Sequence, residues 1–365
     1  MALTNRLLAG IRRIVVLSML LATPAAGQTG VDLTARATFY GDNTEFSNPF
    51  REGETLLGTF ASVFVDARVS ERLVLRGGVF GNQRFGSDDA FDEARPVLAL
   101  IVGSKQSHLI LGTLDTFRRV RAGTEPGPDR TGPHGLLPPM QRETLAFERP
   151  WEAGMQWVLD VPRVKQEAWV HWQQVNTSDQ REVFDAGLTS RIPLRDALTL
   201  RGDVHLVHQG GQLANAAAGP VADSVAAALG VEAAGDVPPL DRLSLEGYAL
   251  VSRYVPDREL DDDSRTGFGT FIRAAVEERG WRAHLILWRA SDYIKAEGDP
   301  LYQTLRRDGT KMRGLRDYAE AGLTRTFRLA PASFLEASVR WHRVENDYEY
   351  SFRILAVAEL AKRLK

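Results

Sequence analysis

The 365-residue chain contains no cysteine. This absence excludes disulfide bonds, thiolate nucleophiles and zinc sites with thiolate ligands, and it suits a chain that crosses an oxidising periplasm. A large net charge of either sign is also lacking, because 45 lysines and arginines and 47 acidic residues leave a formal charge of only -2. The chain therefore has neither the basic excess expected of a nucleic-acid-binding protein nor an acidic tail.

Long apolar runs are absent after residue 27, so no transmembrane helix is expected in the rest of the chain. The N-terminus has a different character: Arg6, Arg12 and Arg13 precede an apolar run over residues 14–22, and small residues follow up to Gly27. This order predicts a cleaved secretory signal peptide over residues 1–27. The apolar run is too short for an anchor helix, which needs roughly 20 residues to span a bilayer.

The mature chain, residues 28–365, is dominated by alternating segments. One of them is SFLEASVRWHRVEND, residues 333–347, in which apolar Leu335, Ala337, Val339 and Trp341 alternate with polar Glu336, Ser338, Arg340 and His342. A two-residue period predicts a strand with one apolar and one ionisable face. In a soluble sandwich the ionisable face would meet bulk water, whereas in an outer-membrane barrel it would line the lumen and the apolar face would meet lipid.

Sixteen such segments follow one another. They are predicted near residues 31–41, 55–69, 72–85, 91–103, 107–117, 143–160, 164–175, 182–191, 197–209, 220–234, 242–254, 265–277, 280–293, 312–328, 333–346 and 349–361. The alanine-rich segment 220–234 also suits a short helix, but an even number of strands favours a strand there.

The connections between these segments alternate between short and long. Tight turns at residues 69–72 and 277–280 contrast with long joins such as residues 118–143. Short periplasmic turns and longer extracellular loops are typical of bacterial outer-membrane barrels. The sequence therefore predicts an all-β fold: a transmembrane antiparallel up-and-down β-barrel of about 16 strands, located in the cell outer membrane.

In this arrangement the mature chain resembles the bacterial outer-membrane β-barrel proteins, and in strand number the sixteen-stranded porins. The resemblance is architectural, and the C-terminus departs from it, since the chain ends AELAKRLK where such barrels usually end on Phe or Trp. The resemblance implies a channel for small polar solutes that contacts outer-membrane lipid and binds no cofactor, metal or nucleic acid. It leaves open whether the protein forms a homo-oligomer. In general porins the loop after the fifth strand folds inward, and the equivalent loop here is residues 118–143, whose Gly and Pro content also suits a solvated external loop.

Charged residues on the ionisable faces and in that loop are the candidates for pore lining. They are Arg118, Arg119 and Arg121 in the loop, and Arg201, Asp203, His205, Arg316, Glu320, Glu336, Arg340, His342 and Arg353 on strands. A narrow passage of low dielectric focuses the field of its lining charges, so these arginines predict a preference for anionic solutes.

Three other functions remain open: export of an anionic exopolysaccharide, as in alginate-export-like barrels, a barrel-embedded hydrolase, and a secreted soluble β-protein. Lumen histidines beside Asp203 or Glu336 could act as acid or base, but hydrogen bonding within the lumen wall explains them more simply. No Ser and His pair lies on the lipid-facing wall, where a phospholipase-like barrel would need one. The acidic run 257–263 lacks the spacing of a calcium loop. The sequence therefore predicts a porin-like channel that is not an enzyme and has no catalytic or metal-binding residue.

Overall fold

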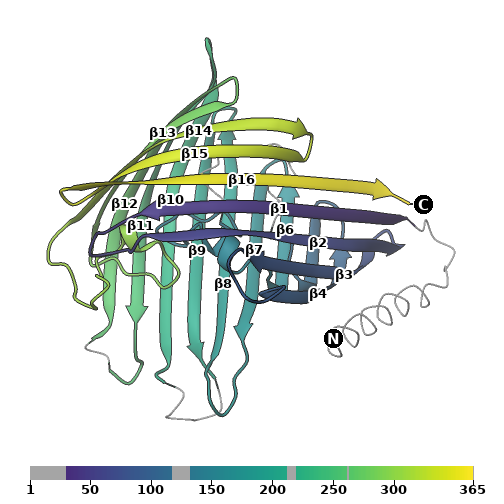
Figure 1. Ribbon diagram of the computed structural model, residues 1–365, viewed down its shortest axis with the longest axis horizontal. Helices are drawn as coiled ribbons and strands as arrows, with labels where there is room; N and C mark the ends of the chain where they lie inside the picture. The colour runs from purple at the N-terminus through teal and green to yellow at the C-terminus, as the bar shows by residue number, and fades with distance from the viewer. Residues whose placement is uncertain (1–29, 117–131, 212–218, 261–262, 365) are drawn as a thin grey trace.

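A computed structural model describes residues 30–116, 132–211, 219–260 and 263–364. Sixteen strands form a closed antiparallel barrel in which neighbours in the chain are neighbours in the sheet, and β1 (Val31–Glu45) closes the barrel against β16 (Asp347–Arg363) (Figure 1). Closure leaves no unpaired sheet edge. The fold class and strand number predicted from the sequence are confirmed. The signal peptide over residues 1–27 lies outside the described residues and stays a prediction.

The other strands follow the predicted order closely. They are β2 (Glu54–Ser70), β3 (Leu73–Arg84), β4 (Glu93–Gly103), β5 (Ser107–Thr113), β6 (Ala153–Val161), β7 (Val164–Gln174), β8 (Glu182–Arg195), β9 (Leu198–Gly210), β10 (Ala222–Val237), β11 (Leu240–Val255), β12 (Arg265–Glu278), β13 (Trp281–Ser291), β14 (Arg316–Ala330) and β15 (Ser333–Val344). The alanine-rich segment is a strand, β10. Turns after even-numbered strands are two or three residues long, whereas most connections after odd-numbered strands are longer. The connections after odd-numbered strands all lie at one end of the barrel, which we call the long-loop end.

One predicted strand, residues 143–160, begins ten residues too early. β6 starts at Ala153, and the preceding segment contains the short helix α3 (Leu145–Glu148). Leu145, Ala146 and Phe147 are buried inside the barrel, so their apolar side chains pack in the interior and do not face lipid. Among the helices of the described residues, α3 and the 3-10 turn η3 (Pro300–Tyr302) included, none has the length and apolarity needed to cross a membrane.

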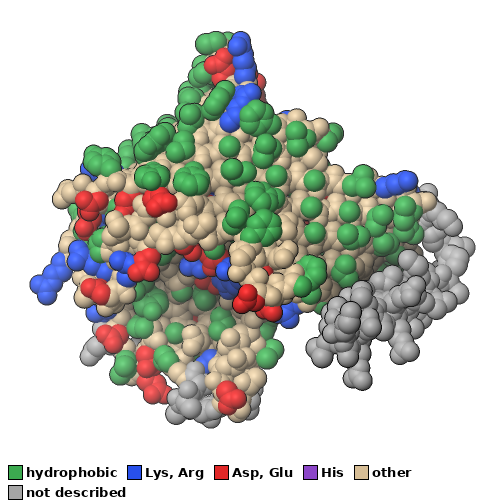
Figure 2. All heavy atoms as spheres, viewed as in Figure 1, with side chains coloured by type: hydrophobic (Ala, Val, Ile, Leu, Met, Phe, Trp, Pro, Cys, Tyr) green, Lys and Arg blue, Asp and Glu red, His purple; other side chains and the backbone are tan. Residues whose placement is uncertain are grey.

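Side-chain exposure alternates along the strands as the sequence predicts. In β15, Leu335 and Trp341 are 36% and 52% exposed on the outside, whereas Glu336, Ser338 and His342 are buried on the inside. Figure 2 shows hydrophobic side chains spread over the outer wall. Such an apolar exterior around a polar interior is the pattern of a barrel surrounded by lipid.

Two long loops fold into the barrel. The described part of the β5–β6 loop buries Leu137 and Met140, and the β13–β14 loop buries Tyr293 and Tyr302, in one hydrophobic cluster with inward-facing wall residues such as Trp288. The loops also bond to each other: the Asp299 amide donates to the Pro138 carbonyl at 2.9 Å. Of the two paths considered for the β5–β6 loop, the inward one is therefore correct from residue 132 onward. The two loops and the wall residues they contact form an apolar core inside the barrel.

A charge placed on the middle of the outer wall should destabilise the barrel. Leu287 lies near the middle of β13 and is 45% exposed toward the lipid side. We expect Leu287→Arg to lower the free energy of unfolding by about 2–4 kcal/mol, because the guanidinium would enter the bilayer core. Leu329→Arg, near the end of β14, is the matched control and should cost about 0–1 kcal/mol. Urea unfolding in lipid vesicles measures both, and equal costs would contradict the membrane placement.

Candidate functional site

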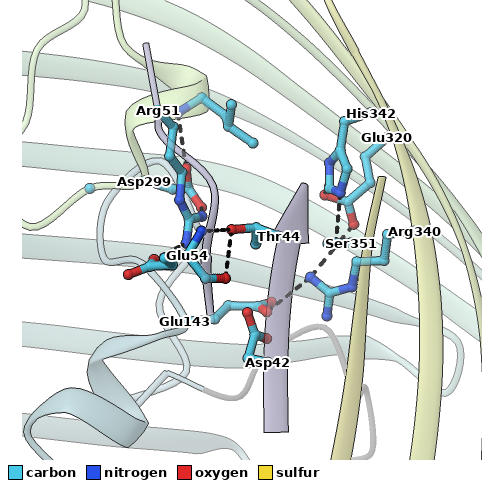
Figure 3. A network of polar contacts seen from close by, with 12 residues as sticks. Asp42, Thr44, Arg51, Glu54, Glu143, Asp299, Glu320, Arg340, His342 and Ser351 are labelled. Carbon is cyan, nitrogen blue, oxygen red and sulfur yellow. Dashed lines mark hydrogen bonds and ion pairs between the residues drawn. The ribbon is translucent and has the colours of Figure 1, made fainter. Parts of the chain in front are cut away.

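Inward-facing residues near the long-loop end of β14, β15 and β16 form a polar network (Figure 3). Ser351 is the fifth residue of β16 and His342 the third from the end of β15. Glu320 of β14 pairs directly with His342 across the sheet, and Arg340 pairs with Ser351. Because every second residue points inward, this register brings the four side chains to one patch of the lumen wall.

Ser351, His342, Tyr318 and Glu320 form a chain of hydrogen bonds. Ser351 Oγ lies 2.8 Å from His342 Nε2, His342 Nδ1 lies 2.7 Å from Tyr318 Oη, and the Tyr318 hydroxyl donates to Glu320 Oε2 at 2.8 Å. A carboxylate only accepts, so Tyr318 uses its proton on Glu320 and its oxygen accepts from Nδ1–H of His342. This assignment leaves His342 Nε2 to accept the Ser351 hydroxyl proton. With a neutral imidazole the network therefore has the hydrogen-bond order, from serine hydroxyl to histidine Nε2, that nucleophilic catalysis uses.

Buried ion pairs surround this chain. Arg340 Nη1 and Arg353 Nη1 lie 3.0 and 2.8 Å from Glu143 Oε2, and Arg353 Nε also contacts Asp42 of β1. Glu143 belongs to the β5–β6 loop, so these contacts bind the inward loop to the wall. A small pocket among these groups is lined by Ser351, His342, Arg340, Arg353, Asp42 and Thr44.

Arg51, in the β1–β2 loop, borders the same pocket. Its guanidinium donates to Asp299 Oδ2 at 2.9 Å and to Glu54 Oε1 at 2.7 Å. Burial disfavours its charged form, but the two carboxylates outweigh burial and raise the pKa of Arg51 above its ordinary value. Arg51 is therefore a fixed positive charge at the rim of the site.

The structure separates the residues predicted to line a pore into several groups. Those on strands all point inward, but Arg118, Arg119 and Arg121 lie outside the described residues. Glu320, Arg340, His342 and Arg353 meet in the network around Ser351, with Glu336 on the same strand, β15, as His342. On β9, Arg201 contacts Asp203 at 2.7 Å and donates to the Gly135 carbonyl at 2.6 Å, and on β14 Arg316 donates to the Leu301 carbonyl at 2.7 Å. His205 belongs to a third group, with Asp185 and Glu297. Whether these residues line a pore stays a prediction.

Three residues of the site were missed by the sequence analysis as functional candidates. Ser351 shares a face with Arg353 by two-residue alternation, so the pattern alone could have placed it inward. Tyr318 shares a face with Glu320 in the same way. Asp42 was placed in a loop, because β1 runs to Glu45 and not to residue 41.

The potential metal ligands of the described residues lie elsewhere, on β8, β9 and the β13–β14 loop. They are Asp185, His205 and Glu297.

His134 fixes the inward β5–β6 loop to the wall. Its Nδ1 lies 2.5 Å from Glu167 Oε1 and its Nε2 lies 2.8 Å from Glu152 Oε2, and its ring stacks on Trp169 with centroids 3.7 Å apart. Burial disfavours the imidazolium, but the two carboxylates outweigh burial and raise the pKa of His134 to about 10. The loop is therefore held by a buried, positively charged histidine.

This pKa predicts a pH-dependent stability. The pKa of His134 rises from an ordinary value of 6.5 to about 10, so its contribution is complete below about pH 6.5 and is lost as pH rises to about 10. We expect wild type to lose stability across this window relative to His134→Gln, measured as urea midpoints. Lys295, whose pKa burial lowers to about 8, acts in the opposite sense at high pH, so the difference between the two proteins, and not the bare profile, reports His134. Parallel profiles would contradict the prediction.

A family model described as lipid A 3'-O-deacylase-type matches residues 23–359. No curated protein matches the chain in sequence. Among solved structures, a loop-deletion mutant of OmpT, an outer membrane protein of Vibrio cholerae, aligns with a TM-score of 0.56 and 10% identity, covering 91% of this chain and 99% of that chain. The anion-selective porin from Comamonas acidovorans gives 0.53 and 9%, covering 91% and 100%, and OccK8 (OprE) of Pseudomonas aeruginosa gives 0.52 and 10%, covering 92% and 100%.

At these identities the solved structures establish the fold alone, which is that of porin-like outer-membrane barrels. The chain is thus an outer-membrane β-barrel, as the sequence predicted. The prediction that it is not an enzyme is wrong, because the family model that matches most of the chain describes deacylases. The sequence pattern has no Ser and His pair on the lipid-facing wall, whereas the structure has one on the lumen wall.

Proposed function

Because the chain belongs to the lipid A 3'-O-deacylase-type family, we propose that it is an outer-membrane hydrolase that removes an acyl chain from lipid A by cleaving a carboxylic ester. The observation that carries this proposal is the 2.8 Å contact between Ser351 Oγ and His342 Nε2, with His342 oriented by Tyr318 and Glu320. Nucleophile, base and orienting groups in this order define a serine hydrolase site.

The reaction proceeds in two halves. His342 Nε2 takes the Ser351 proton while Oγ forms a bond to the ester carbonyl carbon. The bond from that carbon to the sugar oxygen then breaks, and His342 returns the proton to the leaving oxygen. Water, activated by the same histidine, releases the fatty acid and restores Ser351. Arg340 lines the same pocket and is paired with Ser351 across the sheet, so it is the candidate for stabilising the oxyanion.

The position of Ser351 constrains how a lipid reaches it. Ser351 is 8% exposed and points into the lumen near the long-loop end. Long loops of such barrels lie outside the cell, and the outer leaflet holds lipid A on that side. The ester must therefore enter the barrel mouth from the headgroup level, and substrate entry requires local movement of the inward loops.

The test is direct. Purified refolded barrel is incubated with lipopolysaccharide, and lipid A is analysed by mass spectrometry for loss of one acyl chain, with the freed fatty acid quantified in parallel. A heat-unfolded sample is the control for spontaneous hydrolysis. Folded protein that leaves every ester of lipid A intact, and that also fails to cleave a soluble nitrophenyl ester, would contradict the proposal.

Passive passage of small anionic solutes is a second candidate, favoured by the inward-facing arginines of a porin-like barrel. The apolar core formed by the inward loops opposes it, and it opposes export of an exopolysaccharide more strongly, because a polymer needs a wider opening. We expect little steady conductance from the refolded protein in a planar bilayer. Steady, anion-biased conductance in salts of unequal ion mobility would instead favour the channel.

A further inference from the structure

Three side chains of types that commonly bind metal ions meet at β8 and β9, on the opposite side of the barrel from β16. Asp185 of β8, His205 of β9 and Glu297 of the β13–β14 loop each offer a ligand atom, and these atoms lie within 4.8 Å of one another. The side chains of Asp185 and Glu297 are 2% and 11% exposed, and that of His205 is fully buried. Two elements of the wall and one inward loop thus meet at a single buried point.

The two central ligand atoms face each other without a partner. His205 Nδ1 lies 3.2 Å from the Met140 carbonyl oxygen, which can only accept, so Nδ1 carries the proton and Nε2 presents a lone pair. Nε2 and Glu297 Oε2 are 3.8 Å apart, and neither has a hydrogen-bond partner among the described residues. Two buried acceptors aimed at each other are costly unless a cation lies between them.

The other contacts of the cluster resemble the outer shell of a metal site. Asp185 accepts from Trp169 Nε1 at 2.8 Å and from Gln173 Nε2 at 3.0 Å, and Gln173 also donates to Glu297 Oε1 at 2.8 Å. Metal-binding histidines commonly donate their second N–H to a carbonyl, as His205 does, and metal-binding carboxylates are themselves hydrogen-bonded. The geometry of all three side chains is therefore fixed in advance.

We propose that Asp185, His205 and Glu297 bind a divalent transition-metal ion of the zinc type. One imidazole and two carboxylates suit such an ion, whereas calcium takes six to eight oxygen ligands. Zinc at about 2.1 Å from each ligand places ligand atoms roughly 3.4 Å apart. The 3.8 Å between His205 Nε2 and Glu297 Oε2 must then shorten by about 0.4 Å, and the other separations, at most 4.8 Å, by no more than about 1.4 Å. His171 Nδ1, 3.4 Å from Asp185 Oδ2, is the nearest further nitrogen. The ion would cross-link the inward loop to β8 and β9.

Two cations oppose the ion. Arg149 is bonded to Glu297 Oε1, and the buried Lys295 interacts electrostatically with Glu297 and Asp185. These charges offset the carboxylates and weaken the attraction for a dication. Lys295→Met should therefore tighten metal binding. The alternative is a protonated His205 that forms an ion pair with Glu297, and in that case no metal should bind.

The experiment measures binding of Zn²⁺ alone to the refolded full chain in detergent by titration calorimetry, and of Co²⁺ by its visible absorption. We expect one ion per chain. His205→Ala should weaken binding by more than the roughly 10–100-fold that loss of an outer-shell partner costs. His208→Ala, three residues along the same strand and bonded to Asp223, is the matched control and should bind as wild type.

Glu297→Gln provides a second variant in case His205→Ala fails to fold, since Glu297 lies in a loop and not in the wall. Folding is checked by heat-modifiable gel mobility. Folded wild type without stoichiometric binding of either metal would overturn the proposal, as would binding that Glu297→Gln and His205→Ala leave unchanged. The readout is metal binding, so its failure is distinct from failure of the proposed hydrolysis at Ser351.

Discussion

Ser351→Ala should lower the rate of ester hydrolysis by on the order of 10⁴-fold or more while leaving the barrel folded. The variant removes the Oγ that forms the covalent bond to the acyl group, and no other hydroxyl bonds to His342 Nε2 among the described residues. Its structural cost should be small, because the side chain shrinks by one atom on the lumen wall. Fatty acid release from lipopolysaccharide, followed with enzyme in excess, gives the rate.

Ser244→Ala is the matched control for this experiment. Ser244 also points inward, but it lies on β11, away from the pocket around Ser351. We expect its variant to hydrolyse at the wild-type rate. Residual activity in Ser351→Ala close to that of Ser244→Ala would show that another group is the nucleophile.

Variants of the relay should separate catalysis from positioning. His342→Ala should lose about as much activity as Ser351→Ala, and the double variant should be little worse, because the two residues act as a unit. Tyr318→Phe keeps the ring but loses the hydroxyl that links His342 to Glu320. We expect a smaller loss with an altered pH profile of kcat, since His342 loses its orienting partner. A wild-type profile in Tyr318→Phe would remove Tyr318 from the relay.

The sequence predicts the barrel because its walls obey one simple rule. Two-residue alternation fixes both the existence of a strand and the face of each side chain, and the rule needs no knowledge of distant contacts. For the alanine-rich β10 alternation left a short helix open, and the even number of strands decided in favour of a strand. The rule fails for residues 143–152, because an apolar residue in an inward loop and one on a lipid-facing strand look alike in sequence.

The site was predictable only in part for a related reason. Alternation places Glu320, Arg340, His342 and Arg353 on the inner face, and the structure has them there. It does not say what stands opposite: Glu143 comes from a loop whose inward path depends on packing against Trp169 and Trp288. From the sequence, Arg340 and Arg353 suggest a passage for anions. In the structure both arginines pair with Glu143 of the β5–β6 loop, close to Ser351.

The inward loop makes Arg353 central to stability. Arg353 is 7% exposed, contacts Asp42 of β1 and Glu143 of the loop, and lies over the Phe147 ring at 5.3 Å. It therefore joins the closing strand pair of the barrel to the loop that fills it. Removing one partner of a buried ion pair leaves an uncompensated charge, which typically costs about 3–5 kcal/mol.

Arg353→Met should accordingly lower the free energy of unfolding by about 3–5 kcal/mol, measured by urea unfolding in lipid vesicles. Asp42→Asn in the same chain should recover part of the loss, because the carboxylate left behind is then neutral. Arg289→Met is the matched control: its pair with Asp317 is exposed, so the change should stay within about 1 kcal/mol. Equal effects at Arg353 and Arg289 would mean that water reaches Asp42 and Glu143 freely, and the inward loop would then not seal the site around Ser351.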